Sequence, residues 1–190
     1  MNKTQLIMRA LIGFSFSLIL LGCGIPKQYD EYSTAKVYYV DGMLKSEVTR
    51  KNDKEHGIAK RYHGNGQLKI EVPFENGKLH GTAKLYDVNG QIQAKGTFKN
   101  DKHHGITKKY YSNGQLKSEL TYKNNKGDGV QKWYYENGQL KIKATYKNGK
   151  EYGITKYYDV SGQLEEKSTW MNDKEHDMDT MNHNHSMLKF

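Results

Sequence analysis

Residues 129–152 read GVQKWYYENGQLKIKATYKNGKEY, and this 24-residue unit decides the fold. Asn137-Gly138 stands in its middle, and Asn-Gly between alternating segments is the strongest short-range signal for a β-hairpin. A second turn, Asn148-Gly149-Lys150, follows near the end of the unit. The segments around the turns are rich in Tyr, Thr, Val and Ile, which favour strands. The unit therefore predicts two antiparallel strands, with a type I′ turn at Asn137-Gly138 that needs positive φ at both central residues.

The same unit recurs along the chain without an insertion. A turn glycine returns every 24 residues, at Gly42, Gly66, Gly90, Gly114, Gly138 and Gly162. Six units follow from this spacing: 33–56, 57–80, 81–104, 105–128, 129–152 and 153–176. A fixed period of this kind is the signature of a repeat architecture. We therefore predict an all-β protein, an elongated antiparallel β-meander of about twelve short strands built from six hairpin repeats.

The turn register predicts which residues face each other. A two-residue turn at Asn137-Gly138 pairs Lys132 with Lys143 and Gly129 with Tyr146, and an aromatic ring can cover a glycine that lies directly across the ladder. Ser33 and Arg50 take these places in the first unit, as expected of a capping repeat.

Alternation along the strands predicts one apolar and one polar face. The apolar face collects Leu68, Ile70, Val72 and Phe74 in one unit and Leu140, Ile142, Ala144 and Tyr146 in another. The polar face collects Lys, Gln, Thr and a column of tyrosines. Pro73 cannot donate to a ladder, so we expect a bulge or an unpaired position there.

The tyrosine column is accompanied by a lysine column two residues earlier in every unit. The tyrosines are Tyr38, Tyr62, Tyr86, Tyr110, Tyr134 and Tyr158, and the lysines are Lys36, Lys60, Lys84, Lys108, Lys132 and Lys156. In three units the register opposes Lys to Glu, and in the other three it opposes Lys to Lys, which is destabilising.

Two like-charge pairs are consecutive, in units five and six: Lys132–Lys143 and Lys156–Lys167. Together with Tyr134 and Tyr158 they are a candidate binding site for an anionic partner. The alternative is a purely structural role, in which Tyr packs over neighbouring strands and Lys keeps the face soluble.

With the repeat laid out, the chain resembles the bacterial variant of the MORN repeat. Tyr146 to Gly153 matches the family's aromatic-x-Asn-Gly-Lys-x-x-Gly core, and so does Phe74 to Gly81. The Tyr-x-x-Asn-Gly-Gln-Leu-Lys element, as in Tyr110 to Lys117, is typical of the variant in proteins similar to YwqK-type antitoxins. The resemblance covers residues 33 to about 176. It implies an elongated, twisted β-meander that binds proteins or membranes and has no catalytic residues.

The first 22 residues read as a secretion signal rather than as part of the fold. Lys3 and Arg9 form a positive n-region, and an apolar segment from Ala10 to Leu21 follows, too short to span a bilayer comfortably. The segment ends Leu20-Leu21-Gly22-Cys23, which resembles a bacterial lipobox. Cys23 is the only cysteine in the chain. We therefore predict cleavage after residue 22 and acylation of Cys23, with an ordinary signal peptide and an incidental cysteine as the alternative.

Two short segments flank the repeats. Residues 23–32 are predicted to be a tether after the acylated cysteine, and residues 177–190 a disordered tail. The tail contains five residues of types that suit copper: Met178, Met181, His183, His185 and Met187. Their spacing is irregular, so a polar tail without a metal is the preferred interpretation, and no metal site or cofactor is predicted.

Composition and motifs bound the function. The net charge is +9, and loss of Lys3 and Arg9 with the signal leaves +7, which suits anionic lipid, an acidic glycan or an acidic protein. No nucleic-acid motif or catalytic constellation is present, so we predict neither nucleic-acid binding nor an enzyme.

The leading hypothesis is a lipid-anchored envelope protein whose repeats form a protein-binding scaffold. The alternatives are a glycan- or cell-wall-binding module and an antitoxin- or immunity-like inhibitor. Gly24 after Cys23 favours the outer membrane if the cell has two membranes.

Overall fold

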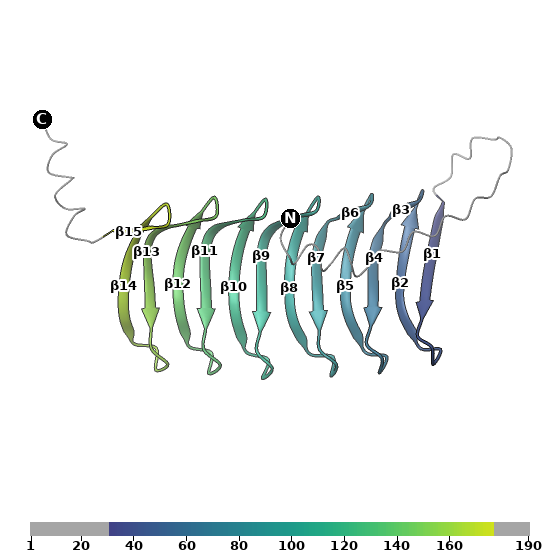
Figure 1. Ribbon diagram of the computed structural model, residues 1–190, viewed down its shortest axis with the longest axis horizontal. Coiled ribbons are helices and arrows are strands. Elements are labelled where there is room, and N and C mark those ends of the chain that lie inside the picture. The colour runs from purple at the N-terminus through teal and green to yellow at the C-terminus, as the bar shows by residue number, and fades with distance from the viewer. Residues whose placement is uncertain (1–30, 177–190) are drawn as a thin grey trace, which may run out of the picture.

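The computed structural model describes residues 31–176. These residues form one open antiparallel sheet, in which nearly every strand lies beside its neighbour in sequence. Figure 1 shows the strands side by side along the long axis, with β1 and β15 at opposite ends. Within this range no helix has the length and apolarity that crossing a membrane requires. The signal segment, Cys23 and the 177–190 tail lie outside the described residues, so the predictions about them stay predictions.

The all-β meander is confirmed, with more strands than the two per unit that the repeat suggested. The strands are β1 (Tyr32–Tyr38), β2 (Leu44–Lys51), β3 (Lys54–Glu55), β4 (Gly57–Tyr62), β5 (Leu68–Glu75), β6 (Lys78–Leu79), β7 (Gly81–Tyr86), β8 (Ile92–Lys99), β9 (Lys102–Tyr110), β10 (Leu116–Lys123), β11 (Lys126–Tyr134), β12 (Leu140–Lys147), β13 (Lys150–Tyr158), β14 (Leu164–Met171) and β15 (Lys174–His176). In the early units one strand is split into two, β3 with β4 and β6 with β7, whereas β9, β11 and β13 are continuous. The short β15 adds a final strand beside β14.

The type I′ turn predicted at Asn137-Gly138 is wrong, and that geometry occurs at the second turn of the unit. Asn137 is not among the residues with positive φ, whereas Gly138 has φ +86°. The amide of Gly138 donates to the carbonyl of Tyr135, and the amide of Tyr135 donates to Gln139, which is typical of a type I turn closed by a glycine bulge. Positive φ at both central residues occurs instead at the other turn, at Asn148 (54°) and Gly149 (87°). The type I′ turn therefore joins successive units.

The glycine bulge also moves the leucine column to the other face. Lys132 pairs with Lys143 as predicted, but the register then shifts, so Tyr134 faces Leu140 rather than Lys141. Directly opposed residues share a face, and a one-residue shift reverses every following side chain. The assignment of Leu68 and Leu140 to the apolar face is therefore wrong. They pair with Tyr62 and Tyr134, in a row that alternates Tyr with Leu or Ile across the sheet.

Gly129 pairs with Tyr146 as predicted, but the reason for the glycine is different. Gly129 has φ +115°, and a Cβ there would lie 3.3 Å from the side chain of Thr121 rather than under the Tyr146 ring. The Tyr146 side chain lies closer to Gly127, where an added Cβ would be 3.5 Å from it. Backbone conformation, not ring coverage, therefore explains the conserved spacing of this glycine within the chain.

Pro73 lies at an irregular position, as expected. It pairs with Ile58 in β4, while on its other side the pairing of β5 passes from β6 to β7. Its carbonyl accepts a hydrogen bond from the amide of His80 at 3.1 Å. The missing N–H of proline is therefore tolerated where the ladder is interrupted.

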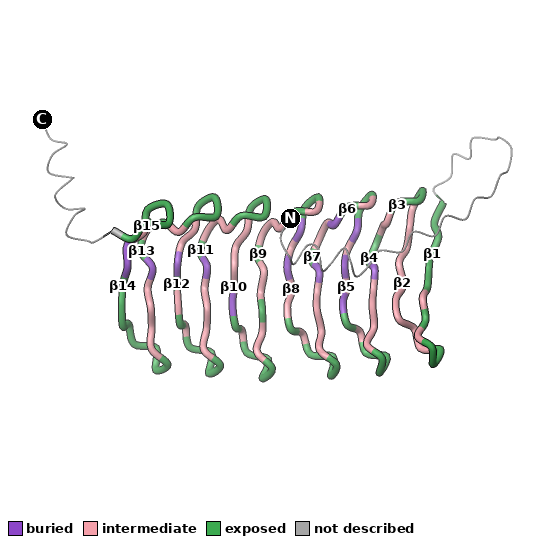
Figure 2. The backbone as a smooth tube through the Cα atoms, viewed as in Figure 1, coloured by how far each residue is buried: buried purple, intermediate pink, exposed green. Residues whose placement is uncertain are grey.

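The buried residues differ between the two halves of the array (Figure 2). The early repeats bury an apolar cluster: Ala59, Ile70, Val72, Phe74, Leu79, Ala83 and Phe98. The later repeats bury mostly small or polar residues, including Ser118, Gln131, Thr155 and Ser168. The Gln131 amide accepts from Thr121 N at 3.1 Å and donates to Thr121 O at 2.7 Å, which replaces ladder bonds where the register shifts.

His103 makes stability depend on pH. Its ring lies 4.1 Å from the Phe98 ring centroid and 5.2 Å from that of Tyr122, and burial lowers its pKa. The unfolded chain therefore binds a proton first, so the free energy of unfolding should fall as pH drops below about 6.5. Denaturant melts between pH 7.5 and 5 should show a shallower fall for His103→Phe than for the wild type. Parallel curves would contradict this assignment.

Candidate functional site

A single row of charged residues crosses the sheet perpendicular to the strands. The pairings within and between repeats join one residue from each long strand into this row. In order, its members are Lys36, Glu47, Lys60, Glu71, Lys84, Lys95, Lys108, Glu119, Lys132, Lys143, Lys156 and Lys167. We call its side of the sheet the lysine face, and the side that carries Ile70 and Val72 the apolar face.

Three glutamates form ion pairs with four lysines in the earlier part of the row. Lys60 lies 3.3 Å from Glu47, and Lys84 lies 3.0 Å from Glu71. Glu119 serves two lysines, Lys108 at 2.7 Å and Lys132 at 3.5 Å. The hydrogen bond from Lys108 lowers the pKa of Glu119, partial burial opposes this, and Lys132 adds to the lowering. The lowered pKa favours the ionised form of Glu119, which pairs with both lysines.

The last four positions of the row are all lysine. Lys132 faces Lys143, Lys143 faces Lys156, and Lys156 faces Lys167, on the adjacent strands β11 to β14. We call these residues the four-lysine row. Within residues 31–176, Lys143, Lys156 and Lys167 have no carboxylate within ion-pair distance. Neighbouring strands lie about 4.8 Å apart, so positive charge is concentrated here.

The sequence correctly predicted two opposed lysine pairs at this end of the sheet, but it did not predict that they form one continuous row. The pairs Lys132–Lys143 and Lys156–Lys167 are confirmed as opposed residues. Lys143 also pairs with Lys156, which joins the two pairs into one row. That pairing depends on the register between repeats, which the turn spacing within one unit does not determine. Lys132 is not an unrelieved charge, because Glu119 of the preceding repeat reaches it. The like-charge pair Lys84–Lys95 is relieved in the same way by Glu71.

The tyrosine column lies beside the charged row on the same face. Tyr62 donates to Glu47 at 3.0 Å, and Tyr86 donates to Glu71 at 3.1 Å. In both cases the acceptor lies fifteen residues before the tyrosine. The equivalent position for Tyr134 is Glu119, but for Tyr158 it is Lys143. Tyr158 therefore lies beside the unpaired Lys143, whereas Tyr62 and Tyr86 donate a hydrogen bond to a carboxylate.

Hydrogen bonds between turns fix the spacing of the repeats around this site. The Tyr135 hydroxyl donates to the carbonyl of Tyr158 at 2.9 Å, and Asn137 Nδ2 donates to the carbonyl of Val160 at 2.8 Å. Equivalent bonds run from Tyr111 to Tyr134 and from Asn113 to Glu136. Each loop is thus tied to the next one, so Tyr134 and Tyr158 are held on a regular backbone.

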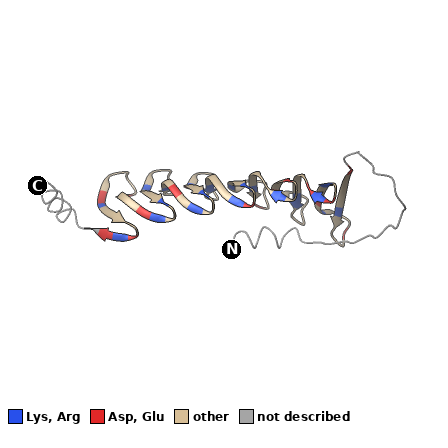
Figure 3. Ribbon diagram, turned by 90° about the horizontal axis from the view of Figure 1, so that it is seen from above, with Lys and Arg blue, Asp and Glu red and all other residues tan. Residues whose placement is uncertain are grey.

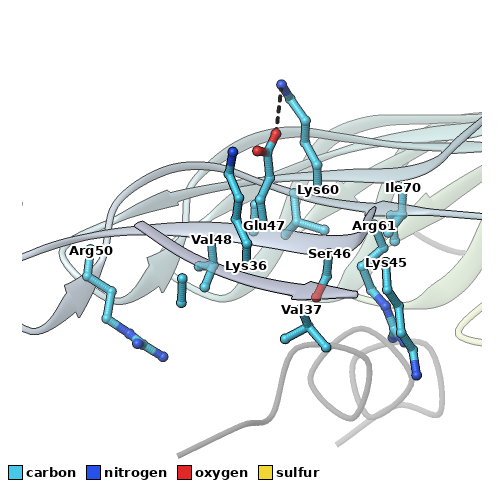
Figure 4. Close-up of a pocket in the computed structure, with 13 residues that line it drawn as sticks. Lys36, Val37, Lys45, Ser46, Glu47, Val48, Arg50, Lys60, Arg61 and Ile70 are labelled. Carbon is cyan, nitrogen blue, oxygen red and sulfur yellow. Dashed lines mark ion pairs between the residues drawn. The ribbon is translucent and has the colours of Figure 1, made fainter. Parts of the chain in front are cut away.

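Figures 3 and 4 show the charged residues along the sheet and the two sides of its first strands. Figure 3 shows the array from above as a narrow strip with basic and acidic residues along its length. Figure 4 shows Lys36, Glu47 and Lys60 on one side of the first strands, and Lys45, Ser46 and Arg61 on the other. A cavity of about 390 Å³ lies at this N-terminal end, lined by both apolar and charged residues. Within the charged row of residues 31–176, three consecutive lysines without an ion pair occur only at the C-terminal end.

The described residues contain no group of three or more His, Cys, Asp or Glu placed to hold a metal ion. The candidate copper ligands Met178, Met181, His183, His185 and Met187 lie outside the described residues. Deletion of residues 177–190 should leave the thermal midpoint unchanged, because the tail follows the last repeat. Any copper affinity should disappear with it. Calorimetric titration of copper into both forms provides the check, and tight binding by the truncated form would contradict it.

Comparison with known families identifies the repeat. A family model for the MORN repeat variant matches residues 55–76, 79–100, 104–124 and 127–148. Four segments of the chain therefore match the MORN repeat variant, where the sequence resemblance extended over six units. Residues 32–54 and 149–176 also form antiparallel strands of the sheet but lie outside the matched segments. No protein with a curated description matches the chain significantly.

Proposed function

We propose that this MORN-variant repeat protein is a lipid-anchored, non-catalytic scaffold of the cell envelope that binds an anionic protein through the C-terminal end of its lysine face. The observation that carries the proposal is the four-lysine row. Opposed like charges destabilise a sheet, and here three such contacts follow one another. An anionic partner would relieve that repulsion, while Tyr134 and Tyr158 would add contact area at low entropy cost.

The position of the row suits a protein that is anchored at its N-terminus. The acylated Cys23 would precede β1, whereas the four-lysine row lies on the last long strands, β11 to β14. Eleven intervals separate β1 from β14 along the sheet order, which at about 4.8 Å each corresponds to roughly 50 Å. The early repeats, in which glutamates pair with most lysines of the row, would act as a spacer that presents the basic end away from the membrane.

Site-specific crosslinking in cells tests this proposal. A photo-reactive amino acid at position 158 should capture a partner protein, identified by mass spectrometry. The same group at position 62 is the matched control, because Tyr62 occupies the equivalent place in a repeat whose charges are paired. We expect strong capture from position 158 and weak capture from position 62. Equal capture from both positions, or none from position 158, would contradict the proposal.

An acidic glycan is the second candidate, and the tyrosine row favours it. Tyr134 and Tyr158 lie beside the lysines on one face, and aromatic rings next to cations suit sugars with carboxylate or phosphate groups. The crosslinking experiment separates the two candidates, since capture of glycan in place of protein at position 158 would favour the glycan.

A further inference from the structure

We infer that the partner contacts the four-lysine row with an α-helix that lies across the strands and carries one carboxylate per turn. This inference rests on the proposed function and specifies the shape of the protein partner. It follows from three features of the lysine face: the spacing of the lysines, the residues on either side of the row, and the place where the row of lysines ends.

The spacing of the lysines matches a helix better than an extended chain. Three intervals of about 4.8 Å separate Lys132 from Lys167, which makes a row of about 14 Å. Carboxylates on successive helical turns repeat every 5.4 Å, so four of them span about 16 Å. Alternate residues of an extended strand repeat every 6.7 Å or so, and four of them span about 20 Å. The helix differs from the row by about 2 Å and the strand by about 6 Å, so the helix requires less displacement of the flexible lysine stems.

Residues on both sides of the row supply apolar contacts. Val130 and Ile154, which lie two residues before Lys132 and Lys156, are 39% and 47% exposed. Tyr134 and Tyr158 lie two residues after the same lysines, so each flank is about 6.7 Å from the row. The two flanks are about 13 Å apart, close to the 10–12 Å diameter of a helix with its side chains, so the long Tyr side chains can reach a helix that lies along the row. The partner helix should therefore carry apolar residues on either side of its acidic stripe.

The end of the row limits the length of the helix. Glu119 lies beside Lys132 on the side of the early repeats, where it would repel a carboxylate of the partner. Beyond Lys167, β14 pairs only with the three residues of β15. Four lysines therefore accept about three helical turns, or roughly eleven residues.

Binding of designed peptides to the mature, acylated protein in detergent tests the inference. One stapled helical peptide would carry Glu at every third or fourth position on one stripe, flanked by Leu. A second peptide of the same composition and charge would place Glu at alternate positions, and inorganic polyphosphate would serve as a simple linear polyanion. By fluorescence anisotropy, we expect the stapled helix to bind at least ten-fold more tightly than the isomer, and polyphosphate to compete weakly.

A matched pair of double variants shows where the peptide binds. Lys143→Glu with Lys167→Glu should abolish binding of the helix. Lys99→Glu with Lys123→Glu is the control, because both residues are exposed, lie outside the row and face another lysine, so the change in charge is the same. Equal affinity for both peptides, tightest binding of polyphosphate, or equal loss in the two double variants would overturn the inference. Crosslinking from position 158 tests the proposed function separately, since it does not depend on the partner's secondary structure.

Discussion

Gly129→Val should destabilise the protein by about 2 kcal/mol or more, whereas Ser33→Val should have little effect. Gly129 has φ +115°, a conformation that costs a β-branched residue on the order of 1–3 kcal/mol. A Cβ there would also lie 3.3 Å from Thr121 Cγ2, which adds a packing penalty. Ser33 lies exposed in β1 opposite Arg50, without positive φ. Urea melts of both variants measure the difference.

Gly153→Val separates the two causes of that destabilisation. Gly153 has φ +80°, but a Cβ there would have nothing within 4 Å. The decrease in the free energy of unfolding of Gly153→Val should therefore reflect backbone strain alone. It should be smaller than the decrease in Gly129→Val. If Gly129→Val and Ser33→Val lose the same free energy of unfolding, the conformation assigned to Gly129 is wrong.

Cys23→Ser should abolish lipid attachment completely. Cys23 is the only thiol in the chain, so no other residue can take the thioether-linked lipid. Loss of the acyl chains removes about 0.8 kcal/mol per buried CH₂, which is enough to convert an anchored protein into a soluble or unprocessed one. Metabolic labelling with a fatty-acid probe, followed by membrane fractionation, gives the result.

Signal-peptide cleavage without acylation predicts a different pattern. In that case the wild type and Cys23→Ser would both be processed, neither would be labelled, and both would be soluble. Equal labelling of the two proteins would show that lipid is attached elsewhere. Either pattern would remove the anchor from the proposed function and leave the binding face to be tested separately.

The sequence predicted the repeat, the meander and most of the hairpin pairing, because a period of 24 residues and the Asn-Gly turns constrain them strongly. It did not predict the turn types. Asn137-Gly138 and Asn148-Gly149 carry the same dipeptide, yet only the second pair has positive φ at both residues. The difference depends on how each turn joins its strands and on bonds to the next repeat, such as Asn137 to Val160, which the dipeptide alone does not encode.

The missed bulge explains the main error about the faces. Strict alternation from Ile142 placed Leu140 on the apolar face, whereas the bulge at Lys141 places Leu140 opposite Tyr134. Such a bulge adds one residue to one strand, and hydrophobicity at a single position does not reveal it. The glycine of each Asn-Gly turn is compatible with such a bulge. A type I turn closed by a glycine bulge and a type I′ turn use the same residues, so both were options at these turns.

The candidate site was predictable within a repeat but not between repeats. The turn arithmetic gave Lys132–Lys143 and Lys156–Lys167 correctly. The contact of Lys143 with Lys156 and the ion pair of Lys132 with Glu119 depend on a register shift around each inter-repeat glycine. That shift comes from backbone geometry near positions such as Gly153, so only the structure shows a continuous row.

Capture of the partner by Lys143→Glu plus Lys167→Glu, measured together with its melting, tests the central claim most directly. The double variant should melt slightly higher than the wild type, because it creates opposite-charge cross-strand pairs worth about 0.2–1 kcal/mol each. It should also lose most of its partner capture, and wild-type capture should weaken as salt rises, since exposed charges are screened beyond about 8–10 Å at physiological ionic strength. Undiminished, salt-insensitive capture by a correctly folded double variant would contradict the assignment of the four-lysine row as the binding site.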